Sequence, residues 1–118
     1  MLPPALATVL RTLDYDAVHL REHFPEDAKD ERWLPEVGRH GWAILTVDLR
    51  IAKSRATHEI LQAADTVAVF LFPSFQKMSR DQQVAWIVAH FSEIERRAES
   101  SKRGTNLMVR QNGKIEKL

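Results

Sequence analysis

The sequence predicts one three-layer α/β domain with a mostly parallel central sheet and a C-terminal hairpin. Helix-like and strand-like patterns alternate along the chain, which is typical of parallel strands joined by crossover helices. Residues 42–46 and 66–72 are nearly continuous apolar runs, as expected of strands covered on both faces, so we predict that they are neighbouring central strands. A length of 118 residues suits a single core, and we assign residues 1–118 to one domain.

The first half of the chain predicts two helices and two strands. Apolar residues recur at helical spacing over residues 2–13, where two early prolines can begin a helix. Residues 17–20 form a short β-prone run that predicts a strand. A second helix is predicted from residue 34 to residue 40, with Pro35 in its first turn, where a proline is tolerated. Residues 42–46 then predict the second strand.

The second half predicts two helices, one strand and a hairpin. Residues 54–65 have the apolar spacing of a helix, and the apolar run 66–72 follows as a strand. Ser79 and Gln82 form a capping-box pattern that predicts the start of the longest helix. In residues 106–118 an Asn-Gly pair separates two short β-prone runs, which predicts a β-hairpin.

Composition limits the class of protein. The chain has no cysteine, so disulfides and thiolate zinc sites are excluded. No apolar run approaches the roughly 20 residues that span a bilayer, and the N-terminus does not resemble a signal peptide, so we expect a soluble cytoplasmic protein. Residues 1–48 hold nine acids and five bases, whereas residues 49–118 hold seven acids and twelve bases. This asymmetry is compatible with an acidic site beside a surface that binds a polyanion, or with ordinary solvated faces.

Asp48 is the first candidate for chemistry because it follows the strand at 42–46. Ligands of open α/β sheets bind beyond the carboxyl ends of the strands, and a carboxylate there can bind a hard cation such as Mg²⁺. The alternative is that Asp48 only caps the next turn. Three cations that follow it could hold phosphates, namely Arg50, Lys53 and Arg55.

Two further groups of residues could bind a metal, and each also has a purely structural interpretation. Asp30 and Glu31 stand near the second helix, where acids are favoured by the helix dipole, yet a loop acid together with Asp48 would be a minimal Mg²⁺ pair. His19 and His23 fit the reversed zinc-protease pattern H-x-x-E-H. That pattern requires both histidines on one helix face, which the strand expected at 17–20 disfavours.

The stretch "LPPALATVLRTLDYDAVHLREH…DAKDERWLPEVGRHGWAILTVDLRI" resembles the PIN-like nuclease domains, and in particular the compact bacterial group related to VapC-type toxins. The group's pattern is a strand carrying an Asp, then L-P-P and a helix, then "G-x-D-V-x-x-L-R", "D-E-x-W" and "G-W-x-x-L-T-x-D". The similarity runs from Leu2 to about Phe72 and more weakly to the tail. The order and spacing of these short motifs make the resemblance fairly specific.

The resemblance implies a metal-dependent ribonuclease that uses Mg²⁺ or Mn²⁺. Clustered carboxylates of the family bind the metal, which positions a water for attack on a phosphodiester. By the match, Asp30 or its neighbour Glu31 is the mid-chain acid and Asp48 is the acid after "LT", with Thr46 orienting it. The residues expected to contact the RNA substrate are Thr46, Arg50, Lys53 and Arg55.

The sequence departs from the family pattern at its start, because Met1 stands where the strand with the first acid should end. We therefore expect a sheet without the family's first strand, and an unpaired edge that favours a homodimer or a partner complex. One hypothesis is a ribonuclease that acts as the toxin of a toxin–antitoxin pair and binds an antitoxin protein. The other is a non-catalytic PIN-like module that binds proteins.

Overall fold

A computed structural model describes residues 2–25 and 27–118 of the chain. Its four-stranded sheet has the order β1-β2-β3-β4, in which β1, β2 and β3 are parallel and β4 is antiparallel to β3. The strands are β1 (Ile44–Thr46), β2 (Ala68–Leu71), β3 (Asn106–Val109) and β4 (Ile115–Lys117). The predicted α/β class with a mostly parallel sheet is confirmed.

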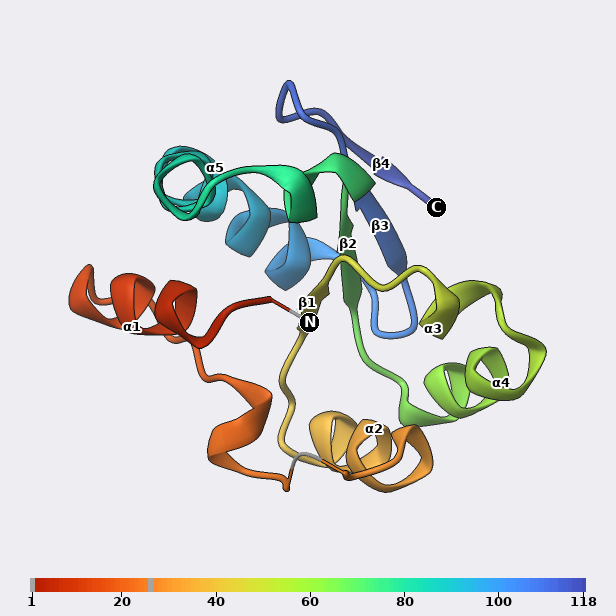
Figure 1. The fold of residues 1–118 in the computed structure, drawn as a ribbon. Coiled ribbons are helices and arrows are strands. Elements are labelled where there is room, and N and C mark those ends of the chain that lie inside the picture. Colours follow the sequence, from red (N-terminus) through yellow and green to blue (C-terminus); the bar gives the residue numbers. More distant parts are fainter. Residues whose placement is uncertain (1, 26) are drawn as a thin grey trace.

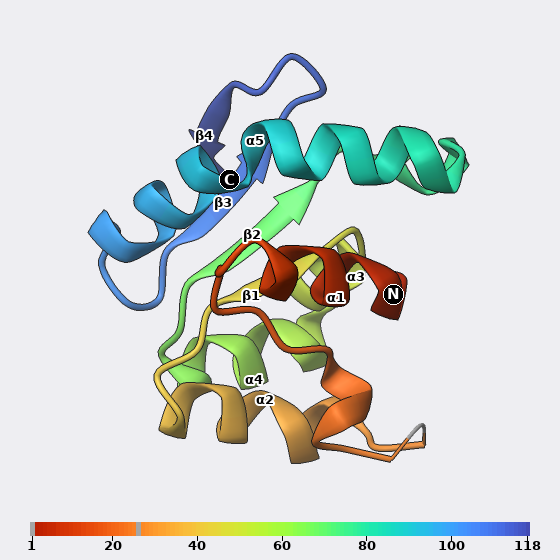
Figure 2. The same ribbon diagram turned by 90° about the vertical axis from the view of Figure 1, so that its left-hand side faces the viewer.

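Helices cover both faces of this sheet, as Figures 1 and 2 show. One face carries α1 and α5, and the other carries α2, α3 and α4. The helices are α1 (Pro4–Thr12), α2 (Asp30–Arg39), α3 (Arg50–Lys53), α4 (Arg55–Ala64) and α5 (Arg80–Ser100), with 3-10 turns η1 (Leu20–Glu22) and η2 (Pro73–Lys77). Among the helices described, none has the length and apolar character needed to cross a bilayer.

Strand β2 explains why the sheet lies between two helical layers. Val69 and Leu71 belong to the core under α1 and α5, whereas Ala68 and Phe70 belong to the core under α2 and α4. All four side chains are buried. Because successive residues of a strand point to opposite faces, an unbroken apolar run is stable only when both faces are covered. This confirms the interpretation of residues 66–72 as a strand within a three-layer fold.

The start of the longest helix, α5, follows from local chemistry. The Ser79 side chain accepts a hydrogen bond from the Gln82 amide, and the Gln82 side chain accepts one from the Ser79 amide. This capping box satisfies two amides that the first turn would leave unpaired. Helix α5 then runs back along the sheet and packs Ile87, Phe91 and Ile94 onto it. The predicted start of this helix is confirmed.

Helix α2 begins at Asp30, so the predicted start near residue 34 is wrong. Pro35 lies inside the helix instead of in its first turn. A proline there removes one helical hydrogen bond, and the burial of Trp33, Leu34 and Val37 offsets that loss. Gly38 lets α2 approach α4 closely, since a Cβ atom at this position would lie 2.0 Å from the carbonyl oxygen of Ala64.

Two expectations about strands are wrong. Residues 17–20 form no strand, because residues 17–19 have no regular secondary structure and Leu20 begins the turn η1. Strand β1 neighbours β2 as predicted, but it lies at the end of the sheet and not at its centre. Both corrections have one cause. Within the described residues, no strand pairs with the second edge of β1 or with residues 17–20.

The C-terminal hairpin is confirmed. Strands β3 and β4 pair in antiparallel register, with Val109 opposite Ile115. Gly113 has φ +91°, a conformation that favours glycine, and the Asn112 side chain accepts a hydrogen bond from the Lys114 amide. The Asn-Gly pair therefore makes the turn that its sequence predicted.

Candidate functional site

A cleft of about 750 Å³ runs along the open edge of β1. Its walls come from α1, residues 16–20, α2, β1 and the second half of α5. Figure 1 shows how these elements are arranged around β1. Most of the side chains that line the cleft are apolar. Polar side chains gather where β1 ends, and they include Thr46, Asp48 and Arg50 together with Asp30 from α2.

Asp48 lies directly beyond the carboxyl end of β1. Its Oδ1 accepts hydrogen bonds from the Arg50 amide at 3.1 Å and from the Arg50 Nε at 2.9 Å, and its Oδ2 accepts one from the Arg50 Nη2 at 2.8 Å. The hydrogen bonds from Arg50 lower the pKa of the Asp48 carboxyl, although partial burial opposes this. Asp48 thus makes the capping contact that was the alternative interpretation, and it also carries a charge within the cleft.

Thr46 fixes the backbone that presents Asp48. This threonine is buried in β1, and its Oγ1 accepts a hydrogen bond from the Asp48 amide at 3.1 Å. A hydroxyl at this position supplies a partner to an amide that the end of the strand would otherwise leave without one. The contact between Thr46 and Asp48 is thus one to the main chain of Asp48 and not to its carboxylate.

Asp30 reaches the same cleft from the first turn of α2. Its Oδ1 accepts a hydrogen bond from the Trp33 Nε1 at 3.1 Å, and the buried indole holds the carboxylate in place. The neighbouring acid Glu31 is exposed and does not line the cleft. Of the two acids that the sequence left as alternatives, Asp30 is therefore the one that the fold brings to the carboxyl end of β1.

Arg50 links the two carboxylates electrostatically. The hydrogen bond to Asp48 raises the pKa of the Arg50 guanidinium most, and the charge of Asp30 raises it further. The Arg50 side chain is nevertheless 86% exposed. The carboxyl end of β1 thus holds two acids near one cation, Arg50, whose side chain remains open to solvent.

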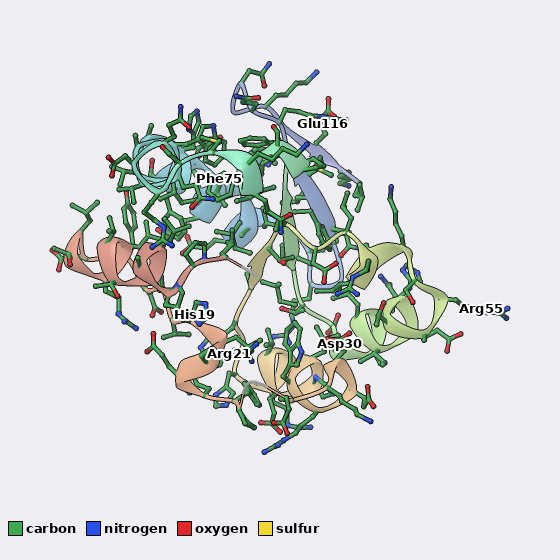
Figure 3. The ribbon with its side chains drawn as sticks, in the orientation of Figure 1. His19, Arg21, Asp30, Arg55, Phe75 and Glu116 are labelled. Carbon is green, nitrogen blue, oxygen red and sulfur yellow. The ribbon has the colours of Figure 1, made fainter. Side chains whose placement is uncertain are left out.

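The other two predicted cations lie outside the cleft. Lys53 ends α3 and Arg55 begins α4, and both side chains are exposed. Figure 3 shows Arg55 pointing away from the region of Asp30, on the outer side of α4. Arg50 is the only one of the three predicted cations that lines the described cleft.

His19 and His23 line the cleft but have other contacts than the zinc pattern requires. The Nδ1 atom of His19 accepts a hydrogen bond from the Arg21 amide, and its Nε2 lies 2.8 Å from the carbonyl oxygen of Leu2. The His23 ring packs against Trp42, with ring centroids 4.9 Å apart. These histidines hold the N-terminal segment and the cleft wall. The H-x-x-E-H spacing gave no indication of that structural role.

Comparison with known protein families identifies the family of this chain. A family model described as a PIN-like domain matches residues 1–73, from the first helix through β2. The chain belongs to the PIN-like domain family. The search of curated proteins returned no match, and the search of solved structures also returned none. The matched stretch contains Asp30, Thr46, Asp48 and Arg50. The PIN-like part of the chain therefore builds the part of the cleft at the carboxyl end of β1.

The carboxylate oxygens of Asp30 and Asp48 are the type of ligand that a hard divalent cation prefers. PIN-like domains generally use such metals, and Mg²⁺ is commonly held by one or two carboxylates, with waters and substrate phosphates completing its shell. Asp30 and Asp48 offer that minimum. Residues 2–25 and 27–118 contain no group of three or more acidic or histidine side chains placed to hold a metal. Asp48 would also have to exchange Arg50 for the cation.

Proposed function

We propose that this PIN-like domain is a metal-dependent endoribonuclease in which Asp30 and Asp48 bind Mg²⁺ or Mn²⁺. The observation that carries the proposal is the convergence of these two acids, 18 positions apart in the sequence, on one cleft at the carboxyl end of β1. Open α/β sheets bind their ligands at that edge. Family membership supports a nuclease-type fold for the same residues.

The roles of the side chains follow from their contacts. Bound at Asp30 and Asp48, the metal would supply an activated water and offset the negative charge that develops on a phosphodiester. Thr46 holds the Asp48 main chain, and Trp33 holds the Asp30 carboxylate. Arg50 is exposed enough to turn from Asp48 to a phosphate of the RNA backbone, a group that a guanidinium binds with two hydrogen bonds.

RNA cleavage tests this proposal. We expect the wild-type chain to cleave a labelled single-stranded RNA with Mn²⁺ and not with EDTA, and we expect Asp48→Asn to lose cleavage. Asparagine keeps an oxygen for the Arg50 amide, so the local turn should survive. Asp81→Asn is the matched control, since it removes the same charge from the exposed first turn of α5. Equal cleavage by wild type and Asp48→Asn would overturn the proposal.

A second function is favoured by one contact. Both oxygens of Asp48 are hydrogen-bonded to Arg50, which leaves the acid neutralised within the protein. This favours a non-catalytic PIN-like module that binds other proteins. Absence of cleavage with any divalent metal, together with stable folding, supports that function over the ribonuclease.

The biological setting that the resemblance to VapC-type toxins favours is a toxin–antitoxin pair. In that setting the chain would arrest growth when expressed alone, and an antitoxin protein would relieve the arrest. Expression of wild type and of Asp48→Asn in a bacterial host separates this setting from a housekeeping ribonuclease. Arrest by wild type and none by the variant supports the toxin.

A further inference from the structure

We propose that the turn of the C-terminal hairpin, residues 110–114, is a second RNA contact, in which Arg110 and Lys114 bind phosphates of the strand that reaches Asp30 and Asp48. This inference rests on the ribonuclease function proposed above and adds to it a surface that holds the substrate. The hairpin turn lies outside residues 1–73, the stretch that matches the PIN-like family, so the family match does not include this contact. The position, the charge and the fixed geometry of the turn support it.

The register of the sheet places the hairpin turn at the same edge as Asp48. Thr46 pairs with Phe70 across β1 and β2, and Phe70 pairs with Met108 across β2 and β3. Asp48 and Arg110 each follow the aligned residue of their own strand by two positions. Adjacent strands lie about 4.8 Å apart, so the ends of β1 and β3 are separated by roughly 10 Å. One short stretch of RNA can therefore reach both ends.

The cations of the hairpin turn also lie on the same face of the sheet as α3. Met108 belongs to the core under α2 and α4, and Glu116 is directly opposite Met108 in the antiparallel register. Opposite residues of an antiparallel pair share a face. Arg110 donates from Nη2 to Oε2 of Glu116 at 3.2 Å, and the Lys114 Nζ lies 3.1 Å from Oε1 of Glu116, which keeps both cations on this face. Arg50, which begins α3, borders the same face.

The hairpin turn is held in a fixed position against α5. The Trp86 Nε1 donates to the carbonyl of Gln111 at 2.9 Å, and the His90 ring stacks on Trp86 with ring centroids 4.2 Å apart. Gly113 lies so close to His90 that a Cβ atom at this position would be 2.8 Å from the imidazole Cδ2. Because the main chain of the turn is fixed before RNA binds, a contact there costs little conformational entropy.

The hairpin turn carries more positive charge than its acid can neutralise. Glu116 is shared by Lys114 and Arg110, whose hydrogen bonds lower the pKa of its carboxyl. The side chains of Arg110 and Lys114 are 59% and 67% exposed, so both can offer N–H donors to a ligand. Guanidinium and ammonium groups bind phosphate through charge-assisted hydrogen bonds. A phosphate at the turn would therefore compete with Glu116 for its two cations.

RNA binding without cleavage tests the contact. The probe is a fluorescein-labelled single-stranded oligouridylate in EDTA, followed by anisotropy, and we expect saturable binding by the chain of residues 1–118. Arg110→Gln and Lys114→Gln should each weaken binding about threefold, and each should lower the slope of log affinity against log salt by about 0.7. Lys102→Gln is the matched control, because Lys102 is an exposed lysine before β3, at the opposite edge of the sheet. No saturable binding, or equal effects of the three variants, would overturn the proposal.

Removing the acid of the hairpin should have the opposite effect. Glu116→Gln frees Arg110 and Lys114 for phosphate, so we expect RNA to bind about threefold more tightly, a gain that a folding defect cannot produce. Glu93→Gln is the matched control, since it changes the net charge equally and frees Arg96 on α5. Unchanged affinity in Glu116→Gln, or an equal gain in Glu93→Gln, would overturn the proposal.

The hairpin contact and the ribonuclease activity can fail separately. Mn²⁺-dependent cleavage that Asp48→Asn abolishes, with an RNA affinity that none of the hairpin variants changes, would overturn the hairpin contact alone. An RNA affinity that responds to the hairpin variants as expected, without cleavage in any divalent metal, would support the hairpin contact and overturn the ribonuclease.

Discussion

Arg50 and Asp48 form a two-point ion pair at the carboxyl end of β1, with Nε donating to Oδ1 at 2.9 Å and Nη2 donating to Oδ2 at 2.8 Å. Two parallel hydrogen bonds between a guanidinium and a carboxylate fix the orientation of both groups. The pair occupies the oxygens that a metal ion would need. A cation that binds Asp48 would therefore have to compete with Arg50.

Removing Arg50 should free Asp48. In Arg50→Gln we expect the pKa of the Asp48 carboxyl to rise toward its ordinary range and Mn²⁺ to bind more tightly, because the competing cation is gone. Carboxyl NMR titration measures the pKa, and calorimetry measures Mn²⁺ affinity. Lys53→Gln is the control, since it removes an exposed cation of the same helix that does not line the cleft. Unchanged pKa and Mn²⁺ affinity in Arg50→Gln would contradict the competition.

The same pair predicts how stability depends on pH. Because the pKa of Asp48 is lowered in the folded protein, its stabilising contribution is complete above the ordinary aspartate pKa of about 3.9 and is lost as pH falls through the lower folded value. Near neutral pH we expect Asp48→Asn to be less stable than wild type by about 0.5–1 kcal/mol. Urea unfolding should show this difference vanish in acid. A difference that is constant with pH would argue against the ion pair as its source.

Thr46 should contribute to stability through its hydroxyl. Thr46→Val has nearly the same shape but leaves the Asp48 amide without its acceptor, and we expect a loss of about 1 kcal/mol in the free energy of unfolding. Thr46→Ser retains the oxygen and separates this effect from packing of the methyl group. Chemical denaturation measures both variants. Equal losses in the two would mean that the hydrogen bond contributes nothing.

Gly38 should be the most sensitive glycine of the N-terminal half. A methyl group there would collide with the main chain of Ala64, so Gly38→Ala should cost about 3 kcal/mol and displace α2, which carries Asp30. Gly41 has φ +71° with open space around it, so Gly41→Ala should cost only the backbone strain of about 1–2 kcal/mol. Thermal unfolding compares the two. A larger effect at Gly41 would contradict the close approach of α2 and α4.

The sequence alone was sufficient to predict a strand that is buried on both of its faces. Residues 66–72 form β2 because an apolar residue at every position needs cover on both faces, and that requirement is visible in the sequence alone. The capping box at Ser79 and the Asn-Gly turn are local chemistry, so they were also predictable. Elements whose state depends on a distant neighbour were not. Residues 17–20 have a β-prone composition, but a strand needs a partner strand, and none of the described segments supplies one.

The helix at Pro35 shows a second limit. Proline disfavours a helix interior by a local rule, whereas the burial of Trp33 and Leu34 is decided by the packing of α2 against α4. Packing prevailed, and α2 starts at Asp30. This earlier start is also what brings Asp30 to the cleft.

The candidate site was predictable in its position and not in its contacts. A carboxylate after a parallel strand lies at the ligand-binding edge whatever the details, so the position of Asp48 followed from the pattern. Which of Asp30 and Glu31 faces the cleft depends on the rotation of α2 about its axis. Because the predicted helix started near residue 34, the sequence could not distinguish the two acids. Likewise, Arg50, Lys53 and Arg55 look equivalent in sequence. Only the turn into α3 directs Arg50 at Asp48 and leaves the others outside the cleft.

Paramagnetic broadening by Mn²⁺ tests most directly whether Asp30 and Asp48 form one metal-binding pair. With backbone amides assigned by NMR, substoichiometric Mn²⁺ should broaden first the amides around Asp30 in α2 and around Asp48 after β1, and both sets together. In Asp48→Asn the broadening of both sets should weaken, while Asp81→Asn should broaden as wild type does. Broadening that begins elsewhere, or that leaves the two sets unaffected by Asp48→Asn, would contradict the paired site.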